Sequence, residues 1–281
     1  MSEHPGGTLD PIRNVTVVRV SERGRSTESD VAAVEEPLEI RLHDRSFAVI
    51  MRTPGADREL AAGFLLAEGV VEDATELGAV EHCRNPHHPD VHNIVNVFLL
   101  GDAVARLEGT LAERRNVMAN SSCGLCGRVT IDSLKTRAEP LKSTMSVAAD
   151  VVHGLPGALR AQQAVFERTG GLHGAALFTT DGVLITSAED VGRHNAVDKV
   201  IGRLLLEERL PIADLVLVVS GRTSYEIVQK AWLGGVPMIC AVSAPSSLAI
   251  ELAAEAGITL LGFAREHAFN IYSHPQRIRA V

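Results

Sequence analysis

Two cysteines separated by two residues carry the clearest chemistry in this chain. Cys123 and Cys126 are each followed by a glycine, Gly124 and Gly127, which frees the backbone to turn and leaves both sulfurs uncrowded. A thiolate on such a turn is within reach of a disulfide, a persulfide or a metal held by its neighbour. We therefore expect a mobile, exposed Cys-x-x-Cys loop over residues 113–139.

Three kinds of chemistry fit this loop. A structural zinc site needs four ligands, and the other two cysteines, Cys83 and Cys240, form no second Cys-x-x-Cys. A thioredoxin-like redox pair normally opens a helix after a strand, whereas the glycines favour a loop. Sulfur transfer needs only a nucleophilic thiolate that is free to swing. The residues alone leave all three open.

A second cluster has spacing that could hold a metal. It consists of His82, Cys83, His87, His88 and His92. Prolines within the cluster are more typical of a solvated loop than of a metal centre.

Composition and charge exclude several classes of protein. The chain has 281 residues, 46% of them hydrophobic, so it can bury one large core or two ordinary ones. No apolar run approaches the roughly 20 residues of a membrane span, and the first ten residues lack the features of a signal peptide. We expect a cytoplasmic protein with no membrane partner. The net charge of −8 argues against nucleic acid, so any anionic ligand must meet a local basic patch.

The first part of the chain predicts a small α+β subdomain over residues 31–112, after a poorly ordered start over 1–30 with one edge strand near 15–20. Within the subdomain, alternating apolar residues predict a β-hairpin over 38–51. Asp57 should cap a helix that begins at Arg58 and ends by Gly69. A strand over 94–100 and a partner over 103–107 complete it.

The second part, residues 140–281, reads as an α/β domain. We expect a helix over 156–168, a hairpin over 175–186 with its turn at Asp181-Gly182, and an amphipathic helix over 196–205. Three strands then alternate with two helices. The strands are predicted over 215–219, 237–242 and 259–263, with a capping box Thr223-x-x-Glu226 and a cap at Ser246 or Ser247 opening the helices.

Parallel strands end on one edge of a sheet, and open α/β sheets bind ligands there. Helix N-termini at such an edge offer free amides and partial positive charge to an anion. Arg222, Arg265 and His267 would add positive charge, and Ser220 would add a hydroxyl. These residues predict a basic patch of a size that suits a phosphate. Residues 189–195 contain Arg193 and His194, which either face the same cleft or merely open a helix capped by Asp190 or Asn195.

Several long, uncommon segments resemble the FdhD family, sulfur carrier proteins needed for formate dehydrogenase activity. The resemblance covers roughly residues 36–278. It is carried by the runs 121–127, 189–199, 220–230, 241–245 and 262–272.

The resemblance implies a defined reaction. A member accepts sulfur from a cysteine desulfurase and passes it to the molybdenum cofactor, in its bis(molybdopterin guanine dinucleotide) form, before that cofactor enters formate dehydrogenase. It implies that Cys123 carries the persulfide and that Cys126 is its partner. The implied cofactor-binding stretch is Phe263, Ala264, Arg265, Glu266, His267 and Ala268.

The resemblance also implies a homodimer and a cytidine-deaminase-like α/β/α sandwich for residues 140–281. No His-x-Glu accompanies a Pro-Cys-x-x-Cys, so the zinc chemistry of deaminases is not expected, nor a tightly bound metal. One departure is Gly174, where the family often has alanine, which leaves the role of His173 open. The alternative function is a cofactor-binding chaperone whose cysteines hold zinc or act as a redox pair.

Overall fold

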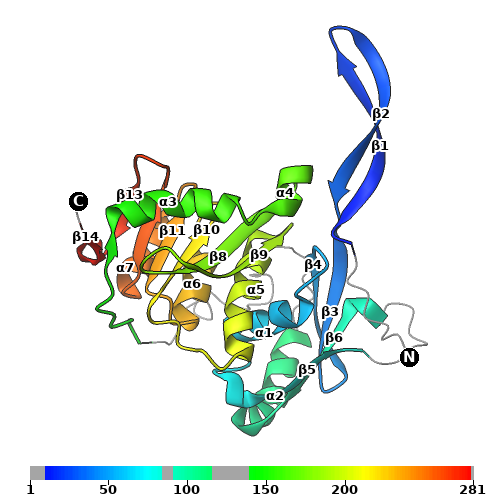
Figure 1. Ribbon diagram of the computed structural model, residues 1–281. Coiled ribbons are helices and arrows are strands. Elements are labelled where there is room, and N and C mark those ends of the chain that lie inside the picture. The colour runs from blue at the N-terminus through cyan, green and yellow to red at the C-terminus, as the bar shows by residue number, and fades with distance from the viewer. Residues whose placement is uncertain (1–9, 84–90, 116–138, 280–281) are drawn as a thin grey trace, which may run out of the picture.

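The computed structural model describes residues 10–83, 91–115 and 139–279, in which a six-stranded and a four-stranded sheet are joined through packed helices (Figure 1). The larger sheet has six strands. From edge to edge they are β13 (Asn270–Ser273), β12 (Thr259–Gly262), β11 (Met238–Ala241), β10 (Leu215–Val219), β8 (His173–Thr179) and β9 (Leu184–Asp190). β10, β11 and β12 run parallel, as predicted, while β8, β9 and β13 make antiparallel pairs.

Helices cover both faces of this sheet because its central strands are apolar on both sides. Val216 and Val218 of β10 face a cluster that contains Leu155 of α3 (Ala149–Arg160). Leu215 and Leu217 face the opposite cluster. That cluster includes α5 (Arg193–Leu206), α6 (Tyr225–Leu233) and α7 (Ser247–Glu255). Continuous apolar runs such as Leu215–Val219 are typical of strands buried on both faces.

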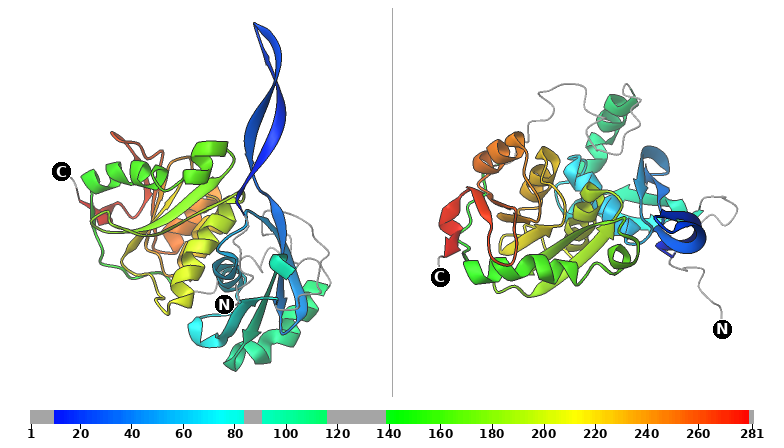
Figure 2. Two further views of the ribbon diagram at one scale, coloured as in Figure 1. Left: turned by 45° about the vertical axis from the view of Figure 1, so that its right-hand side comes forward. Right: turned by 90° about the horizontal axis from the view of Figure 1, so that it is seen from above.

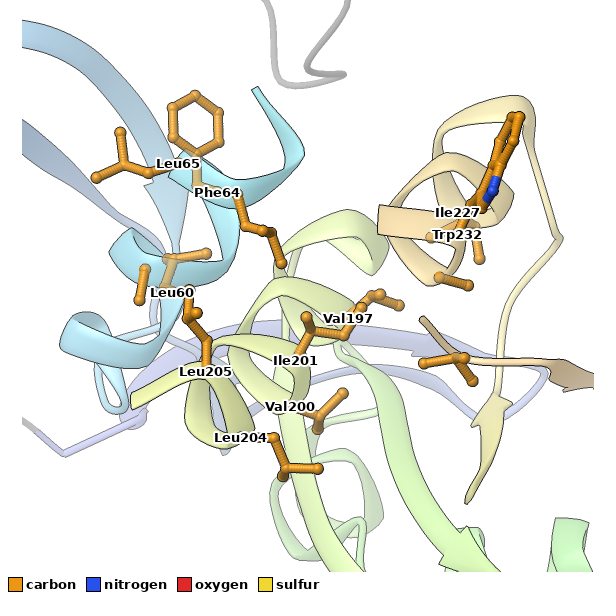
Figure 3. Close-up of a cluster of buried hydrophobic side chains, with 14 of the residues drawn as sticks. Leu60, Phe64, Leu65, Val197, Val200, Ile201, Leu204, Leu205, Ile227 and Trp232 are labelled. Atoms are coloured by element: carbon orange, nitrogen blue, oxygen red, sulfur yellow. The ribbon is translucent and has the colours of Figure 1, made fainter. Parts of the chain in front are cut away.

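The smaller sheet has four strands in the order β4-β3-β6-β5. They are β4 (Arg45–Arg52), β3 (Glu36–Leu42), β6 (Ile94–Leu99) and β5 (Leu77–His82). The predicted hairpin over 38–51 is confirmed as β3 and β4. Helix α1 (Asp57–Ala67) lies between this sheet and α5, and side chains of α1, α5 and α6 form one core (Figure 3).

Helices α1 and α5 touch backbone to backbone where two glycines meet. A Cβ at Gly63 would lie 2.8 Å from the Cα of Asp198, and one at Gly202 would lie 2.6 Å from the backbone N of Gly63. No side chain fits at either position without moving a helix. Through this crossing, α1 holds the smaller sheet against α5, and α5 begins at the edge of the larger sheet.

The N-terminal prediction was wrong for the residues that the structure describes. In place of a poorly ordered segment with one edge strand, β1 (Ile12–Ser21) and β2 (Gly24–Ala33) pair along their whole length as an antiparallel arm. The arm projects from the body (Figures 1 and 2). Its β-branched residues supply the strand preference that the polar composition masked.

Two other element predictions were wrong. Residues 103–107 belong to helix α2 (Gly101–Arg115), because Ala103 and Leu107 lie four residues apart and bury one face of a helix. The antiparallel partner of β6 is β5 and not residues 103–107. The helix predicted over 156–168 is two helices, α3 and α4 (Ala164–Thr169), and α3 begins well before Pro156.

Two predicted caps were also wrong. The carboxylate of Asp57 receives both Nε and Nη2 of Arg52 at 2.9 Å, so it is not available to cap α1. Thr223 and Glu226 form no capping box, and Ser224 is the N-cap residue of α6. Ser246 does cap α7, accepting a hydrogen bond from the backbone N of Ala249.

Short elements complete the described chain. They are η1 (Ala74–Glu76), η2 (Val91–Asn93), η4 (Pro275–Arg277) and the parallel pair β7 (Val147–Ala148) and β14 (Ile278–Arg279). Among the described helices, none is both long enough and apolar enough to span a bilayer. The fold is mixed α/β with helices on both faces of the main sheet; the likeness to cytidine deaminase stays a prediction.

Candidate functional site at the carboxyl edge of the main sheet

The carboxyl ends of β10, β11 and β12 meet the ends of two further strands at one edge. His173, at the start of β8, pairs with Asp190 at the end of β9. Gly174 exchanges hydrogen bonds with Ser220, which follows β10: the Gly174 backbone N donates to Ser220 Oγ (2.8 Å), and the Ser220 backbone N donates to Gly174 O (3.0 Å). Helices α5, α6 and α7 begin at this edge. The amides of their first turns carry partial positive charge, and the anion-binding patch stays a prediction.

Backbone hydrogen bonds join the connections at this edge into one continuous rim. The backbone N of Thr223 donates to Ala244 O (3.2 Å), and that of Ser246 donates to Thr223 O (3.0 Å). The next connection is attached in the same way, since the backbone N of Phe263 donates to Ser243 O (3.2 Å). The segments that the sequence predicted to converge are therefore in direct contact.

The stretch 263–268 forms the lip of the rim. Phe263 is 47% exposed and adopts a left-handed backbone (φ 52°), whereas Ala264 beside it is fully buried. Arg265 donates from Nη1 to the carbonyls of Val242 and Ala264, so its guanidinium is held against the rim. Glu266 and His267 are exposed, and Glu266 Oε2 lies 3.9 Å from His267 Nε2. Ala268 accepts a hydrogen bond from the Arg265 backbone N, closing the turn.

Arg193 and His173 flank the backbone of Gly221 on the other side of the rim. A Cβ at Gly221 would lie 3.3 Å from His173 Nδ1 and 3.8 Å from Arg193 Cβ. Burial lowers the pKa of His173, and the charge of Arg193 lowers it further, so a neutral imidazole is favoured there. Arg222, next in sequence, adds its charge to the surroundings of the same ring.

His194 contacts two residues that the sequence analysis did not assign to the site. Its Nε2 lies 3.1 Å from Ser224 Oγ and 3.1 Å from Glu226 Oε2, and Ser224 Oγ donates to that same carboxylate oxygen (2.8 Å). Burial would raise the pKa of Glu226, but hydrogen bonding and charge from His194 more than offset it, so the pKa is lowered. Ser224 and Glu226 meet the same ring nitrogen, which is not the geometry of a hydrolase triad.

Asp190 anchors the turn that presents Arg193 and His194. Its buried carboxylate accepts hydrogen bonds from the Gly192 backbone N (2.8 Å), Asn195 Nδ2 (2.8 Å) and the Thr53 backbone N (3.1 Å), and Lys199 Nζ lies at 2.7 Å. Asp190 and Asn195 thus shape the helix entry, although the N-cap residue is Gly192. The anchored turn places Arg193 beside Gly221, and the role of Arg193 and His194 in a ligand cleft stays a prediction.

Within the described residues, three buried side-chain atoms have no hydrogen-bond partner, and all three belong to this edge. They are Gln163 Nε2, Arg193 Nε and Thr223 Oγ1. Gln163 packs on Gly174, where a Cβ would lie 2.8 Å from Gln163 Cδ. An alanine at residue 174 would push this amide aside, so glycine there leaves room for Gln163. Buried polar groups without partners are uncommon, and these three gather at one edge of the sheet.

The described residues that follow the cysteine segment lie at the opposite edge of the sheet. Cys123 and Cys126 fall outside the described residues. Trp232, at the end of α6, donates from Nε1 to Glu139 O (2.9 Å), and the Leu141 backbone N donates to Ala256 O (2.8 Å) just after α7.

The predicted His82–His92 cluster is only partly described, because His87 and His88 lie outside the described residues. Cys83 is half-buried and Cys240 is fully buried. In the described part of the chain, no three His, Cys, Asp or Glu side chains converge as metal ligands would. The zinc alternative for the Cys-x-x-Cys loop stays untested.

Comparison with known proteins identifies the family. The family model described as "FdhD/NarQ family" matches residues 33–279. The "Sulfur carrier protein FdhD" of Streptomyces coelicolor is 47% identical over 93% of this chain and 94% of its own length, and that of Sulfurisphaera tokodaii is 45% identical over 95% and 99%.

A solved structure has the same fold. It is a putative formate dehydrogenase accessory protein from Desulfotalea psychrophila, with a TM-score of 0.76 and 25% identity, covering 96% of this chain and all of that one. From the match over residues 33–279 and the identities above, the chain belongs to the FdhD/NarQ family.

Proposed function

We propose that this protein is a sulfur carrier for formate dehydrogenase maturation. In this proposal Cys123 accepts a sulfur atom from a cysteine desulfurase as a persulfide, with Cys126 as its partner thiol. The sulfur then passes to the molybdenum cofactor, which is the substrate rather than a resident group. Membership of the family and the names of the relatives support the role.

The observation that carries the proposal is the group of unpartnered buried polar atoms at the carboxyl edge. Gln163 Nε2, Arg193 Nε and Thr223 Oγ1 lie where three helices begin. Two of the three atoms are N–H donors and the third is a hydroxyl, so together they suit a ligand rich in acceptor oxygens. The diphosphates of a guanine dinucleotide are such a ligand, and helix N-termini favour their charge.

The described residues suggest how the dinucleotide would be held. Arg193, Arg222 and Arg265 would meet phosphate oxygens, and Ser220 would orient the first rim connection through Gly174. Exposed Phe263 offers an aromatic face to a guanine or pterin ring. His194 lies 3.1 Å from Glu226 Oε2, so that carboxylate is already engaged within the protein.

A persulfide assay tests the sulfur-carrying half of the proposal. After incubation with a cysteine desulfurase and cysteine, intact-mass and peptide mass spectrometry should find an adduct of about 32 Da on Cys123. Cys123→Ala should abolish it, while Cys240→Ala, which changes a fully buried thiol, should not. No adduct in the native protein, or an adduct that survives Cys123→Ala, refutes the assignment. Stoichiometric zinc in the purified protein would instead favour the chaperone alternative.

A binding assay tests the cofactor half. Isothermal titration with GDP, which carries the guanine and a diphosphate, should show binding that weakens when Arg193 is changed to Gln. The matched control is Arg209→Gln, a half-exposed arginine in the connection after α5, away from the edge. If the native protein and both variants bind GDP with equal affinity, the nucleotide does not bind at this edge. The homodimer, the cytoplasmic location and the cytidine-deaminase likeness stay predictions.

A further inference from the structure

The lip, residues 263–268, shares a hydrophobic core with helix α3. Ala264 near its start and Phe269 just after its end pack in one cluster with Val152 and Leu155 of α3. Between these two anchors the lip is exposed. Helix α3 runs beside the connection between β12 and β13 that carries the lip (Figures 1 and 2). The lip is therefore supported from the face of the sheet opposite to α5, α6 and α7, the helices that begin at the rim.

One side chain of α3, that of His153, contacts the lip directly. Its Nδ1 lies 3.3 Å from the carbonyl oxygen of Arg265, and its ring centroid lies 5.1 Å from that of Phe269, with the two rings tilted by 55°. A carbonyl oxygen only accepts hydrogen bonds, so Nδ1 carries the proton and donates to this oxygen. Aromatic rings attract each other at this separation, and the contact with Phe269 holds the imidazole in the orientation that directs Nδ1 toward the lip. His153 thus fastens the lip where its turn begins.

The lip needs to be fastened because its first residue is strained. Phe263 has a left-handed backbone (φ 52°), which residues other than glycine seldom adopt, and its side chain is exposed. Strained conformations persist only where the surrounding structure holds them. Two backbone hydrogen bonds define the shape of the lip, from Phe263 N to Ser243 O (3.2 Å) and from Arg265 N to Ala268 O (2.9 Å). The Arg265 carbonyl, to which His153 donates, lies inside the turn that the second of these bonds closes.

We propose that His153 is a positioning residue of the candidate site, which keeps the lip in the shape that places Phe263 at the rim. The inference rests on the proposed function for the identity of the ligand, a guanine dinucleotide. His153 acts through the Arg265 carbonyl and does not touch the ligand. Loss of its N–H would let the turn open and let Phe263 relax toward ordinary backbone angles. A ligand would then have to restore the lip before it could bind, and its affinity would fall accordingly.

GDP binding by the full chain tests this role. Isothermal titration compares the native protein with two variants. His153→Leu keeps a bulky side chain in α3 but has no donor, whereas His153→Asn places its Nδ2 at the position of Nδ1. His153→Leu should weaken GDP binding about fivefold, the effect of losing one ordinary hydrogen bond. His153→Asn should recover most of the affinity, because it restores the N–H and because asparagine and histidine have similar helix propensities.

Hydrogen exchange without ligand measures the lip itself. In His153→Leu the amide of Arg265, which donates to Ala268 O, should exchange about fivefold faster, while the amides of the buried strand β10 keep their native rates. The matched control is His274→Asn. Native His274 Nε2 lies 2.9 Å from Ala254 O at the opposite edge of the sheet, and asparagine is too short to keep that contact. This control should change neither GDP affinity nor the exchange of the lip.

Three results would overturn the inference. One is native GDP affinity together with native exchange in His153→Leu. Another is faster exchange of the lip with unchanged GDP affinity, which would make His153 a structural residue only. The third is a His153→Asn protein that binds GDP no better than His153→Leu, which would exclude the N–H as the contact that positions the lip. Failure of the proposed function would look different. The native protein itself would then bind no GDP or carry no persulfide on Cys123, while the exchange measurement would still decide whether His153 holds the lip.

Discussion

Replacing Gly202 by alanine should loosen the contact between the two parts of the molecule. Gly202 lies in α5 where α1 crosses it, and the added Cβ would overlap the carbonyl oxygen of Glu59 and lie 2.6 Å from the Gly63 backbone N. Ordinary contacts of a Cβ are 3.4–4 Å. The neighbours are backbone atoms inside a helix, so they cannot rotate away. The helices would have to separate by about 1 Å, and their shared core would lose contacts.

The size of the effect follows from two opposing terms. Overpacking of a close contact costs about 3 kcal/mol when the backbone has to move. Alanine also favours the helix by about 1 kcal/mol over glycine, which offsets part of that cost. The free energy of unfolding should therefore fall by about 2 kcal/mol. With 281 residues at about 2.1 cal/mol/K each, that corresponds to a drop in Tm of about 3–4 °C.

Urea unfolding followed by circular dichroism measures this change directly. Gly157→Ala is the matched control, because Gly157 is a helical glycine in α3 with no atom within 4 Å of its Cβ position. The control should gain up to about 1 kcal/mol. If Gly202→Ala is as stable as the native protein, the close crossing of α1 and α5 is wrong, and so is the rigid placement of α5 at the site.

Three further predictions concern buried and half-buried groups. In the native protein Lys230 Nζ lies 2.7 Å from the buried carboxylate of Asp198, and Lys230→Met would leave that carboxylate without its cation. The free energy of unfolding, measured in urea melts, should fall by about 3–5 kcal/mol. A second change, Asp198→Asn, should recover part of the loss. Burial lowers the pKa of His173, so just below the ordinary histidine pKa the unfolded state binds more protons than the folded state. Stability should therefore decrease as the pH falls through about 6.5, and His173→Asn should flatten that dependence on pH. An unchanged slope in the variant would contradict the buried neutral ring. Burial raises the pKa of Cys240 to about 12, so iodoacetamide should leave it unmodified in the folded protein while half-buried Cys83 reacts, and prompt labelling of Cys240 would contradict the packing.

Patterns along the chain determined the elements of the main sheet. The runs at 215–219 and 237–242 are apolar, short and bounded by turn residues, and these features specify buried parallel strands. Because parallel strands share a direction, the sequence also placed Ser220, Arg222 and Arg265 at one edge. Local periodicity failed at residues 103–107, where alternation and helical spacing overlap in a short segment.

Only the tertiary structure decided which polar groups meet across the chain. His194 and Glu226 are far apart in sequence, and no local pattern could indicate that they share Ser224. The same holds for Asp190, which joins Thr53, just after β4, to Lys199 of α5. The buried atoms of Gln163, Arg193 and Thr223 were equally invisible, because a missing partner is defined only after every neighbour is in place. Sequence determines local shape through short-range sterics and burial, whereas a site depends on contacts between distant segments that folding alone brings together.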